Sequence, residues 1–510
     1  MSVSDRTPVI IGVGEASERI DAPDYAALSP ADLAARAAAT ALADAGADGL
    51  AAHIDVVAAI PQFEVSGPRV VAPFGASNNF PRSLARRVGA DPVRAIWEAV
   101  GGQGPQHLVN ELAHAIAAGE AEMALIAGSE AISTVRHLQA KGETRDWAEI
   151  ADGAVEDRRF DAQGMLTAEL VQHGARTPIS VYAMFENARR AREGKDRAAY
   201  ALEMGRLFAP FTQVAAGNPH AMSREVYSPE ALATVTERNR LTSDPFPRRM
   251  VARDQANQGA AVLLTSVGKA RALGVPQDRW IYLWGGADVK ERTPVERADL
   301  SRGPASVAAA KRALEAAGVD LSDIGVIDLY SCFPIAVFNI CDGLGLAPDD
   351  PRGLTVTGGL PFFGGAGNNY SMHAIAEMVR RLRARPGAVG FLGANGGFLS
   401  KYSVGIYSSA ERAFQPFDSK PLQAEVDAWT APALDQGFEG EAAVETYTID
   451  YAQASPRGVV VARSPARARV VAMTDDPAVA REMIETDPLG RRVTIAAGDQ
   501  GLRRVQGFSG

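Results

Sequence analysis

The residues of this chain whose types could support chemistry gather around two glycine-rich turns, residues 101–104 and 364–367. The pattern predicts that a helix follows each turn. Backbone N–H groups at such turns can donate hydrogen bonds to the negative charge that develops on a substrate oxygen. Polar and titratable side chains follow the second turn directly: Asn368, Asn369, Tyr370 and His373.

The elements that must position these turns occur twice in the same order. Ala-Leu-x-x-Ala-Gly at residues 41–46 recurs at 313–318, and Ile-Asp at 54–55 recurs at 327–328. In each copy a helix and a buried strand precede the glycine turn, and a helix and a strand follow it. A repeat with a period of roughly 260–275 residues indicates two similar domains related by a pseudo-twofold axis, with any site shared between them.

Strands that alternate with helices predict an α/β fold with mostly parallel sheets. The first half comprises residues 1–130 plus 251–270, and the second half comprises 271–412. Residues 131–250 are polar and rich in Arg and Glu, so we interpret them as an insertion that covers the site. Residues 416–510 contain short strands at regular spacing, which predict a small additional β-barrel domain.

The composition excludes several classes of function. The 510 residues are 46% hydrophobic and carry a formal net charge of −9, which argues against nucleic acid or an anionic membrane as the main partner. No apolar run approaches the length of a membrane span, and residues 1–8 lack a signal-peptide pattern. The two cysteines, Cys332 and Cys341, form no disulfide framework, so we expect a cytoplasmic protein. No Cys/His spacing suggests a metal site, and Gly12-Val-Gly14 lacks the third glycine of a dinucleotide fingerprint.

Several short motifs resemble the thiolase superfamily, in particular its sterol-carrier-protein type. Ala-Gly-Ser-Glu-Ala at 127–131 is similar to the family's Gly-Gly/Ala-Glu-Ser strand end, and residues 217–221 and 254–261 resemble the segments that close the first half. Leu-Tyr-Ser-Cys-Phe at 329–333 is similar to the His-Asp-Cys-Phe motif. The resemblance covers residues 8–412 and implies a duplicated fold of five layers, α/β/α/β/α, with a loop insertion. The C-terminal β-barrel-like (OB-like) domain lies outside it.

The chain departs from this family at the catalytic positions. The nucleophilic cysteine of a thiolase falls on Gly101, and its activating Gly-His-Pro falls on Gly-Gly-Ala at 364–366. A second catalytic cysteine falls in Ala-Asn-Gly at 394–396, and the first histidine of His-Asp-Cys-Phe is Tyr330. Cys332 remains, and the resemblance implies that it acts as an acid or base. Without the nucleophile, acyl transfer through an acyl-enzyme has no chemical support.

Two functions fit this pattern. The first is an enzyme of the acetyl-CoA acetyltransferase-like branch that forms or cleaves C–C bonds in acyl-CoA thioesters without a covalent intermediate. The second is a non-catalytic protein that binds CoA thioesters or serves as a scaffold. For the first function the local proton-transfer groups are Cys332, Tyr330, His373 and Tyr370. The local oxyanion donors are the N–H of Gly101 and the side chains of Asn368, Asn369 and Asn395.

Structural explanations compete with each assignment. Cys332 can instead be a small side chain buried in the core at the end of a strand. His373 can instead pack between the two domains. Capping of the helix explains one of the two asparagines Asn368 and Asn369, but less readily both. The cluster Arg189, Arg190 and Arg192 is either a solvated helix face or a contact to the 3′-phosphate of CoA. The resemblance implies no covalently bound cofactor, an acyl-CoA as substrate or ligand, and a homodimer or a monomer. By analogy with cysteine-free aldolase relatives, the barrel could be a fused counterpart of their OB-fold subunit.

Overall fold

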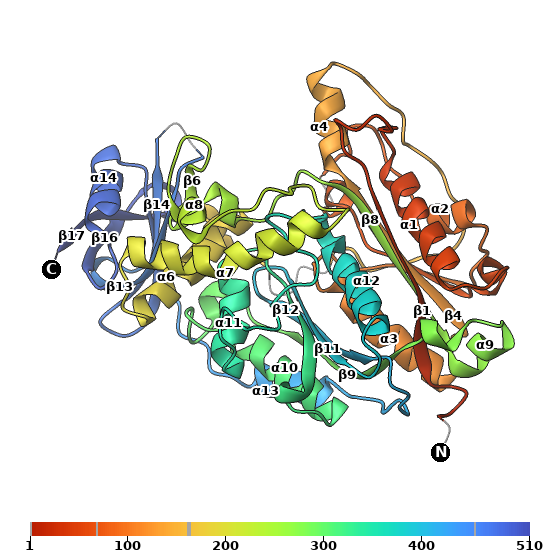
Figure 1. Cartoon of the computed structure of the whole chain (residues 1–510). Helices are drawn as coiled ribbons and strands as arrows, with labels where there is room; N and C mark the ends of the chain where they lie inside the picture. Colours follow the sequence, from red (N-terminus) through yellow and green to blue (C-terminus); the bar gives the residue numbers. More distant parts are fainter. Residues whose placement is uncertain (1–2, 68–69, 161–164, 453–454, 510) are drawn as a thin grey trace.

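Two copies of one α/β unit form the core of the computed structural model, which describes residues 3–67, 70–160, 165–452 and 455–509 (Figure 1). The strands of the first half follow the order β3-β2-β4-β8-β1, and those of the second half follow the matching order β10-β11-β12-β9. Antiparallel pairing of Val9 on β1 with Tyr282 on β9 joins the sheets of the two halves at their edges. The first set is β1 (Pro8–Ser17), β2 (Val56–Ala59), β3 (Arg94–Trp97), β4 (Met123–Ala131) and β8 (Asn257–Ser266). The second set is β9 (Ile281–Lys290), β10 (Ile324–Leu329), β11 (Val389–Gly396) and β12 (Lys401–Ser408).

The sheets are not mostly parallel, and on this point the sequence-based prediction is wrong. The pairs β2–β4 and β10–β11 are parallel, as alternating strands and helices predict. In each half, however, an inserted strand (β8 or β12) runs antiparallel to both of its neighbours. A short loop connects β11 to β12, and the insertion connects β4 to β8. Because neither connection is a single crossover helix, the strands it joins need not be parallel.

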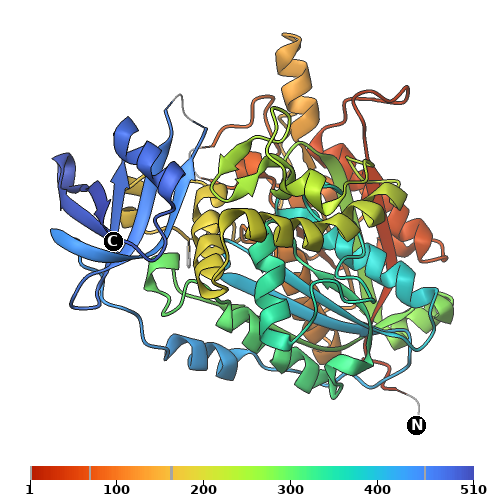
Figure 2. The same cartoon turned by 60° about the vertical axis from the view of Figure 1, so that its left-hand side comes forward.

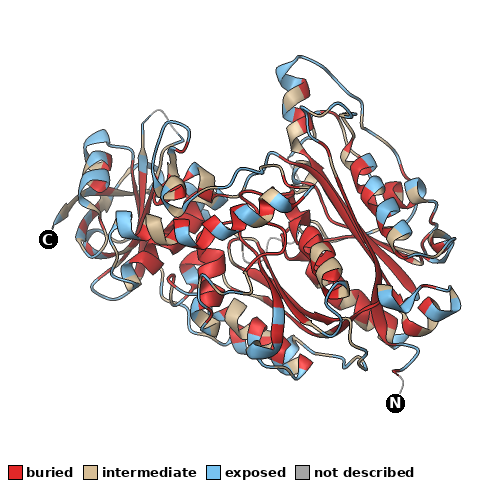
Figure 3. Ribbon diagram, in the orientation of Figure 1, coloured by how far each residue is buried: buried red, intermediate tan, exposed pale blue. Residues whose placement is uncertain are grey.

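Helices fill the remaining three of five layers, which confirms the predicted architecture. α1 (Pro30–Asp44) and α2 (Phe80–Val88) cover the outer face of the first half. α10 (Pro304–Ala317) and α11 (Pro334–Leu344) cover the outer face of the second half. α3 (Gly104–Ala118) and α12 (Tyr370–Arg383) lie between the two sheets (Figure 1). Figure 3 shows that the sheets and these central helices are buried, while the outer helices expose one face.

Small residues at one contact explain why the same short motif occurs twice. A Cβ atom at Gly12 of β1 would lie 2.1 Å from the carbonyl oxygen of Ala41 on α1. The equivalent Gly285 of β9 would place a Cβ 2.8 Å from the carbonyl oxygen of Ala313 and 2.6 Å from the nitrogen of Ala317 on α10. In both halves glycine lets the first helix lie directly on the sheet. Gly12 therefore has a packing role, and its likeness to a nucleotide-binding motif has no further meaning.

Segment 131–250 does not fold as one separate unit. β5 pairs with the edge strand β3, α6 and α7 pack against α11, and the β6–β7 hairpin joins the C-terminal barrel. Its helices are α4 (Ile132–Ala140), α5 (Ala168–Gln172), α6 (Pro178–Arg192), α7 (Arg197–Gly217) and α8 (Pro229–Ala233). Its strands are β5 (Glu156–Asp157), β6 (Leu241–Ser243) and β7 (Phe246–Pro247), and α9 (Val267–Ala272) follows β8.

The C-terminal region contains the predicted barrel, a closed ring of strands in the order β13-β14-β15-β17-β16 and back to β13 (Figure 2). The strands are β13 (Gly440–Asp450), β14 (Arg457–Arg463), β15 (Arg469–Thr474), β16 (Arg492–Ala497) and β17 (Arg503–Ser509), with α14 (Pro477–Thr486) between β15 and β16. α13 (Lys420–Asp427) instead packs on β9 and α10 of the core. Among the described residues no helix is long and apolar enough to cross a membrane.

Buried polar contacts join the barrel to the insertion. The Arg190 guanidinium on α6 is 1% exposed and donates to both carboxylate oxygens of Asp487, at 2.6 and 2.9 Å. Asn187, one helical turn earlier, donates to the backbone carbonyls of Asp244 and Tyr447, each at 3.0 Å. The barrel and the insertion therefore act as one packed unit.

Replacing Arg190 by Ala should lower the free energy of unfolding by about 3 kcal/mol, because it leaves Asp487 without its partner at a packed interface. Urea unfolding of the full chain measures this change. Arg481→Ala, at an exposed position of α14, is the matched control and should change the value by less than about 0.5 kcal/mol. Equal effects of the two substitutions would contradict a role for Arg190 in holding the barrel.

Candidate active site

A cavity of about 790 Å³ lies where the two halves and the insertion meet, and we call it the central cavity. β10 and β11 run parallel and end side by side, so Tyr330 and Cys332 after β10 lie beside Asn395 at the end of β11. The turn that precedes α3 supplies Gly101 and Gly102 from the first half. Both halves contribute to the lining, as the repeated turns predict for a shared site.

The turn before α3 is built for glycine. Gly101 has a φ of +147°, and a Cβ there would lie 2.2 Å from Oε1 of Gln103. A Cβ at Gly102 would lie 2.2 Å from the hydroxyl oxygen of Tyr330. A side chain at either position therefore requires its neighbours to move, and at Gly101 it also requires a backbone conformation that L-residues rarely adopt.

The Gly101 amide is already occupied, which corrects its assignment as an oxyanion donor. It donates to Oδ1 of Asn368 at 3.0 Å, while Nδ2 of Asn368 donates to the Pro61 carbonyl at 2.8 Å. Asn368 thus lines the central cavity but ties the two halves together. The N–H of Gly102, by contrast, has no hydrogen-bond partner within the part of the chain that the structure describes. Gly102 is therefore the donor from this turn that a ligand can use.

The inner end of the cavity is polar but uncharged. Burial raises the pKa of the Cys332 thiol to about 12, so the group stays protonated at neutral pH. Nδ2 of Asn395 lies 3.8 Å from Sγ of Cys332 and 2.8 Å from the hydroxyl of Tyr182, to which it donates. Burial also raises the pKa of Tyr182 and of Tyr330 well above the usual value. These groups can donate hydrogen bonds, but none is an ionised nucleophile or base.

Three predicted site residues do not line the cavity. His373 is fully buried with Nδ1 2.6 Å from Oε1 of Glu15, and the hydroxyl of Tyr370 lies 2.6 Å from Oγ1 of Thr357. Asn369 donates to the Gly128 carbonyl at 2.7 Å. α12 is enclosed between the two sheets, so residues on its first turn have protein on every side. Our assignment of His373 and Tyr370 to proton transfer and of Asn369 to the oxyanion site is therefore corrected.

The cluster Arg189, Arg190 and Arg192 lies away from the cavity, paired with acidic side chains. Nε of Arg189 lies 2.9 Å from a carboxylate oxygen of Asp342, to which Arg192 also donates, and Arg190 is bound to Asp487. α6 is wedged between the second half and the barrel, so this face is neither solvated nor open to a phosphate. The cluster has a structural role, which replaces its predicted contact to CoA.

A different set of arginines lines the mouth of the cavity, and the sequence analysis did not single it out. We call Arg238, Arg240, Arg248 and Arg249 the arginine rim. The Arg249 guanidinium lies over the Tyr227 ring, 4.4 Å from its centroid. The high density of arginines within residues 238–253 could have indicated a local site for an anion, but the negative net charge of the whole chain argued against such a site.

Glu130, at the end of β4, was also missed. Its side chain is fully buried, and Oε1 accepts the Phe63 amide at 2.8 Å. Oε1 would lie only 2.0 Å from a Cβ at Gly367, and both Phe63 and Gly367 line the central cavity. Burial, reinforced by the charges of Glu64 and Asp254, raises the pKa of Glu130 well above its usual value. A carboxyl group in this state next to a cavity is a candidate for proton transfer.

Among the described residues, one group of side chains outside the lining of the central cavity has the ligand atoms that a metal ion needs: Glu98, His107 and Glu111. Arg158 donates to Glu98 at 3.2 Å and to Glu111 at 2.7 Å, so its guanidinium already neutralises both carboxylates. Nδ1 of His107 lies 3.2 Å from Asp288 in the second half. These contacts account for the cluster without a metal.

Comparisons with known proteins agree with this geometry. The family model of the thiolase-like protein type 1 additional C-terminal domain matches residues 421–500. The crystal structure of a monomeric SCP2-thiolase like protein type 1 from Mycobacterium smegmatis is 44% identical, with a TM-score of 0.86, and the match covers 99% of this chain and 100% of that one. Comparison with curated protein sequences finds no match.

Two more distant structures share the fold of the core. The Ltp2-ChsH2(DUF35) aldolase is 20% identical with a TM-score of 0.58, over 80% of this chain and 98% of that one. Acetyl-CoA acetyltransferase from Syntrophomonas wolfei is 16% identical with a TM-score of 0.52, over 79% of this chain and 99% of that one. The fold and its central cavity thus define a thiolase-like protein. The chain belongs to the family of SCP2-thiolase-like proteins of type 1, which carry an additional C-terminal domain.

Gly101→Ala should lower the free energy of unfolding by about 1–3 kcal/mol, because a Cβ forces strain at a positive φ and displaces Gln103. Chemical denaturation measures the change. The matched control is Gly325→Ala, at a strand position where the nearest atom to the new Cβ is 3.8 Å away. If Gly101→Ala were as stable as the wild type, position 101 could hold a side chain and our account of the missing cysteine would fail.

Glu130→Gln should make the protein more stable at pH 8 than the wild type. A carboxyl group whose pKa is raised on folding binds its proton more tightly in the folded state, so stability falls as pH rises above the pKa of an unfolded carboxyl. Gln has no acidic proton, so it abolishes this loss of stability with rising pH, and its side-chain oxygen can still accept a hydrogen bond from the Phe63 amide. Thermal unfolding from about pH 5 to about pH 8 measures the difference. Parallel pH profiles for the two proteins would contradict the raised pKa.

Proposed function

We propose that this protein binds an acyl-CoA thioester in the central cavity and handles it without forming an acyl-enzyme. The observation that carries the proposal is the polarity of the cavity along its length. Four arginines line the mouth, where the phosphates of CoA would lie, and uncharged donors line the inner end. A thioester is a neutral, weak hydrogen-bond acceptor, so it suits an inner end that holds no ion.

The donors at the inner end suit the thioester carbonyl. The N–H of Gly102, which has no partner in the described part of the chain, lies at the N-terminus of α3, where the helix dipole favours negative charge. The protonated Cys332 thiol also lines the cavity and offers a further donor, while Nδ2 of Asn395 already donates to Tyr182. With Gly101 in place of the nucleophile and the Cys332 thiol protonated, no group among the described residues of the lining is suited to take the acyl chain covalently.

We also propose that the protein is a monomer. The relative from M. smegmatis is described as monomeric. In this chain β5 pairs with β3, which covers an edge of the sheet that another chain could otherwise extend. Arg94 donates to Glu156 on β5 at 2.6 Å and to Glu111 on α3 at 3.1 Å, which holds the covering strand in place.

Calorimetric titration with acetyl-CoA should give one site per chain, and the double variant Arg248→Gln/Arg249→Gln should weaken binding by about tenfold, because two charges at the phosphates are lost. The difference should shrink at high salt. Arg481→Gln, at an exposed position of α14, is the control and should bind like the wild type. Mass spectrometry after incubation should show no added acyl mass. Absence of binding, or an acyl adduct on Cys332, would overturn the proposal.

Glu130 supports a second candidate function, cleavage of a β-hydroxyacyl thioester. Its carboxylate would take the proton of the β-hydroxyl; the bond between the α and β carbons would break, and its electron pair would pass to the α carbon as an enolate held by the donors near Gly102. The α carbon then takes up a proton. The raised pKa makes the ionised form of Glu130 a stronger base than an ordinary carboxylate.

Release of an aldehyde or ketone from β-hydroxyacyl-CoA compounds tests this second candidate. Glu130→Gln should abolish release and leave acetyl-CoA affinity unchanged. If the wild type binds these compounds and releases no product, the binding function stands and the lyase function is excluded for them.

A further inference from the structure

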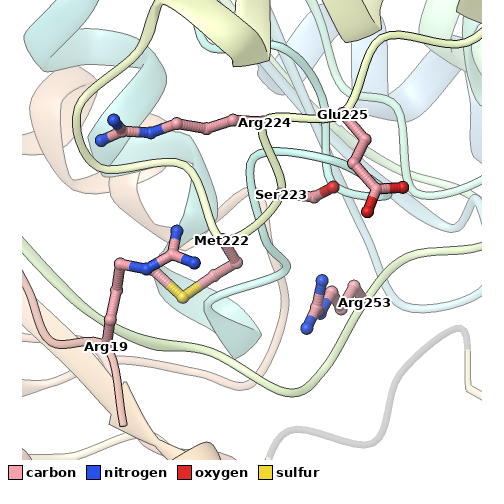
Figure 4. A pocket seen from close by; sticks show the side chains of 6 residues that line it. All are labelled: Arg19, Met222, Ser223, Arg224, Glu225 and Arg253. Atoms are coloured by element: carbon pink, nitrogen blue, oxygen red, sulfur yellow. The ribbon is translucent and has the colours of Figure 1, made fainter. Parts of the chain in front are cut away.

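A second cavity of about 550 Å³ adjoins the central cavity, and we call it the side cavity (Figure 4). Arg19, Arg224 and Arg253 reach it from three different loops, and among the described residues Glu225 is the one carboxylate in its lining. Ser223 and Arg253 line both cavities, so the two spaces are neighbours. None of the arginine rim lines the side cavity.

The side cavity has more positive charge than its protein partners neutralise. The carboxylate of Glu225 accepts a hydrogen bond from the hydroxyl of Tyr227. The Arg253 guanidinium has no hydrogen bond or ion pair among the described residues, and Asp254 beside it is bound to Arg136. Burial and the positive charges of Arg248 and Arg19 hold the pKa of Arg253 below its usual value. An anion in this cavity would relieve that repulsion.

The remaining two arginines are also available to an anion. Arg224 donates to the Pro219 carbonyl at 2.6 Å, a contact that orients its guanidinium, and no carboxylate in the described part of the chain forms an ion pair with it. Arg19 pairs with Asp21 at 3.3 Å, with the side chains 41% and 71% exposed. Exposed pairs of this kind contribute little and give way readily to a better partner.

Backbone contacts connect the side cavity to the wall of the central cavity. The amides of Met222 and Ser223 donate to the carbonyls of Phe363 and Phe362, and the Gly365 amide donates to the Arg253 carbonyl. The amide of Ala252, next to Arg253, donates to the carbonyl of Cys332, so the side cavity lies close to the inner end of the central cavity. Because the proposed function assigns the rim to the phosphates of CoA, an anion bound by these three arginines would come from another part of the ligand.

We propose that the side cavity binds a carboxylate at the far end of the acyl chain, so that the preferred ligands are CoA thioesters of dicarboxylic acids. This inference rests on the proposed function, because it needs the thioester in the central cavity. Arg19, Arg224 and Arg253 would hold the carboxylate with charge-assisted hydrogen bonds. A methyl-ended chain of equal length would leave the three guanidinium groups without a partner.

Calorimetric titration with matched pairs of ligands tests the proposal: butyryl-CoA against succinyl-CoA, and octanoyl-CoA against suberoyl-CoA. The wild type should bind the carboxylate-ended member of at least one pair about tenfold more tightly. Arg19→Gln/Arg224→Gln should remove this preference and leave the affinity for the methyl-ended member unchanged. Both positions are exposed, so folding should be unaffected, which thermal unfolding checks.

The outcomes separate this inference from the function on which it rests. Equal affinity within every pair would overturn the inference alone. A loss of affinity in the double variant that is equal for free CoA and for all its thioesters would assign the side cavity to the nucleotide phosphates and also overturn it. If no CoA compound bound the wild type, the proposed function would fail together with the inference.

Discussion

The hydrogen bond from the Gly101 amide to Asn368 is the contact around which the centre of this molecule is arranged. It ties the turn before α3 to the turn before α12, and both turns must approach closely for it to form. The approach is possible because three residues at this place have no Cβ. A Cβ at Gly101 would lie 2.2 Å from the Gln103 side chain, and one at Gly396 would lie 1.8 Å from it. A Cβ at Gly102 would lie 2.2 Å from the hydroxyl oxygen of Tyr330. The same closeness that joins the halves leaves no room for a nucleophile on the turn. The packing of this turn therefore excludes a cysteine at position 101, and a single Gly101→Cys substitution would not restore a thiolase nucleophile.

The charges of the cavity follow from how its walls are built. The inner end is formed by strand ends and helix starts from the core, and burial there keeps Cys332 and Tyr330 uncharged. The mouth is formed by the insertion, whose loops remain at the surface and can carry arginines. β6 brings Arg240 and Thr242 to this mouth, and β6 is itself held by pairing of Ser243 with Asp450 of the barrel. The additional domain thus supports the part of the cavity that would recognise charge.

The fold could be predicted from the sequence because the repeated residues have a structural role in both halves. Ala41 and Ala313 recur because each receives a glycine of the facing strand, so the repeat reports the helix-on-sheet contact directly. About half of the predicted site residues do line the cavity, because they stand at the ends of strands or at the starts of helices, which the topology brings together. These residues are Gly101, Tyr330, Cys332, Asn368 and Asn395. The direction of the inserted strands could not be predicted, since the loops that precede them leave it open.

The rest of the site depends on pairing that a sequence does not display. His373 stands one turn into a helix, and only the enclosure of α12 between two sheets shows that it faces Glu15 and not the cavity. Arg190 and Arg248 are alike in the sequence, but one is bound to Asp487 and the other faces the cavity mouth. Glu130 stands in the Ala-Gly-Ser-Glu-Ala motif, but the sequence does not show that its carboxyl group is buried beside the cavity.

The structure of the protein in complex with a stable thioether analogue of acetyl-CoA would test the central claim most directly, because it locates both ends of the ligand at once. Our account predicts the carbonyl oxygen within hydrogen-bond distance of the Gly102 N–H, the phosphates at the arginine rim, and Gly101 unmoved against Asn368. A ligand bound elsewhere, or a turn that opens so that the Gly101 amide leaves Asn368 and takes the carbonyl itself, would contradict it.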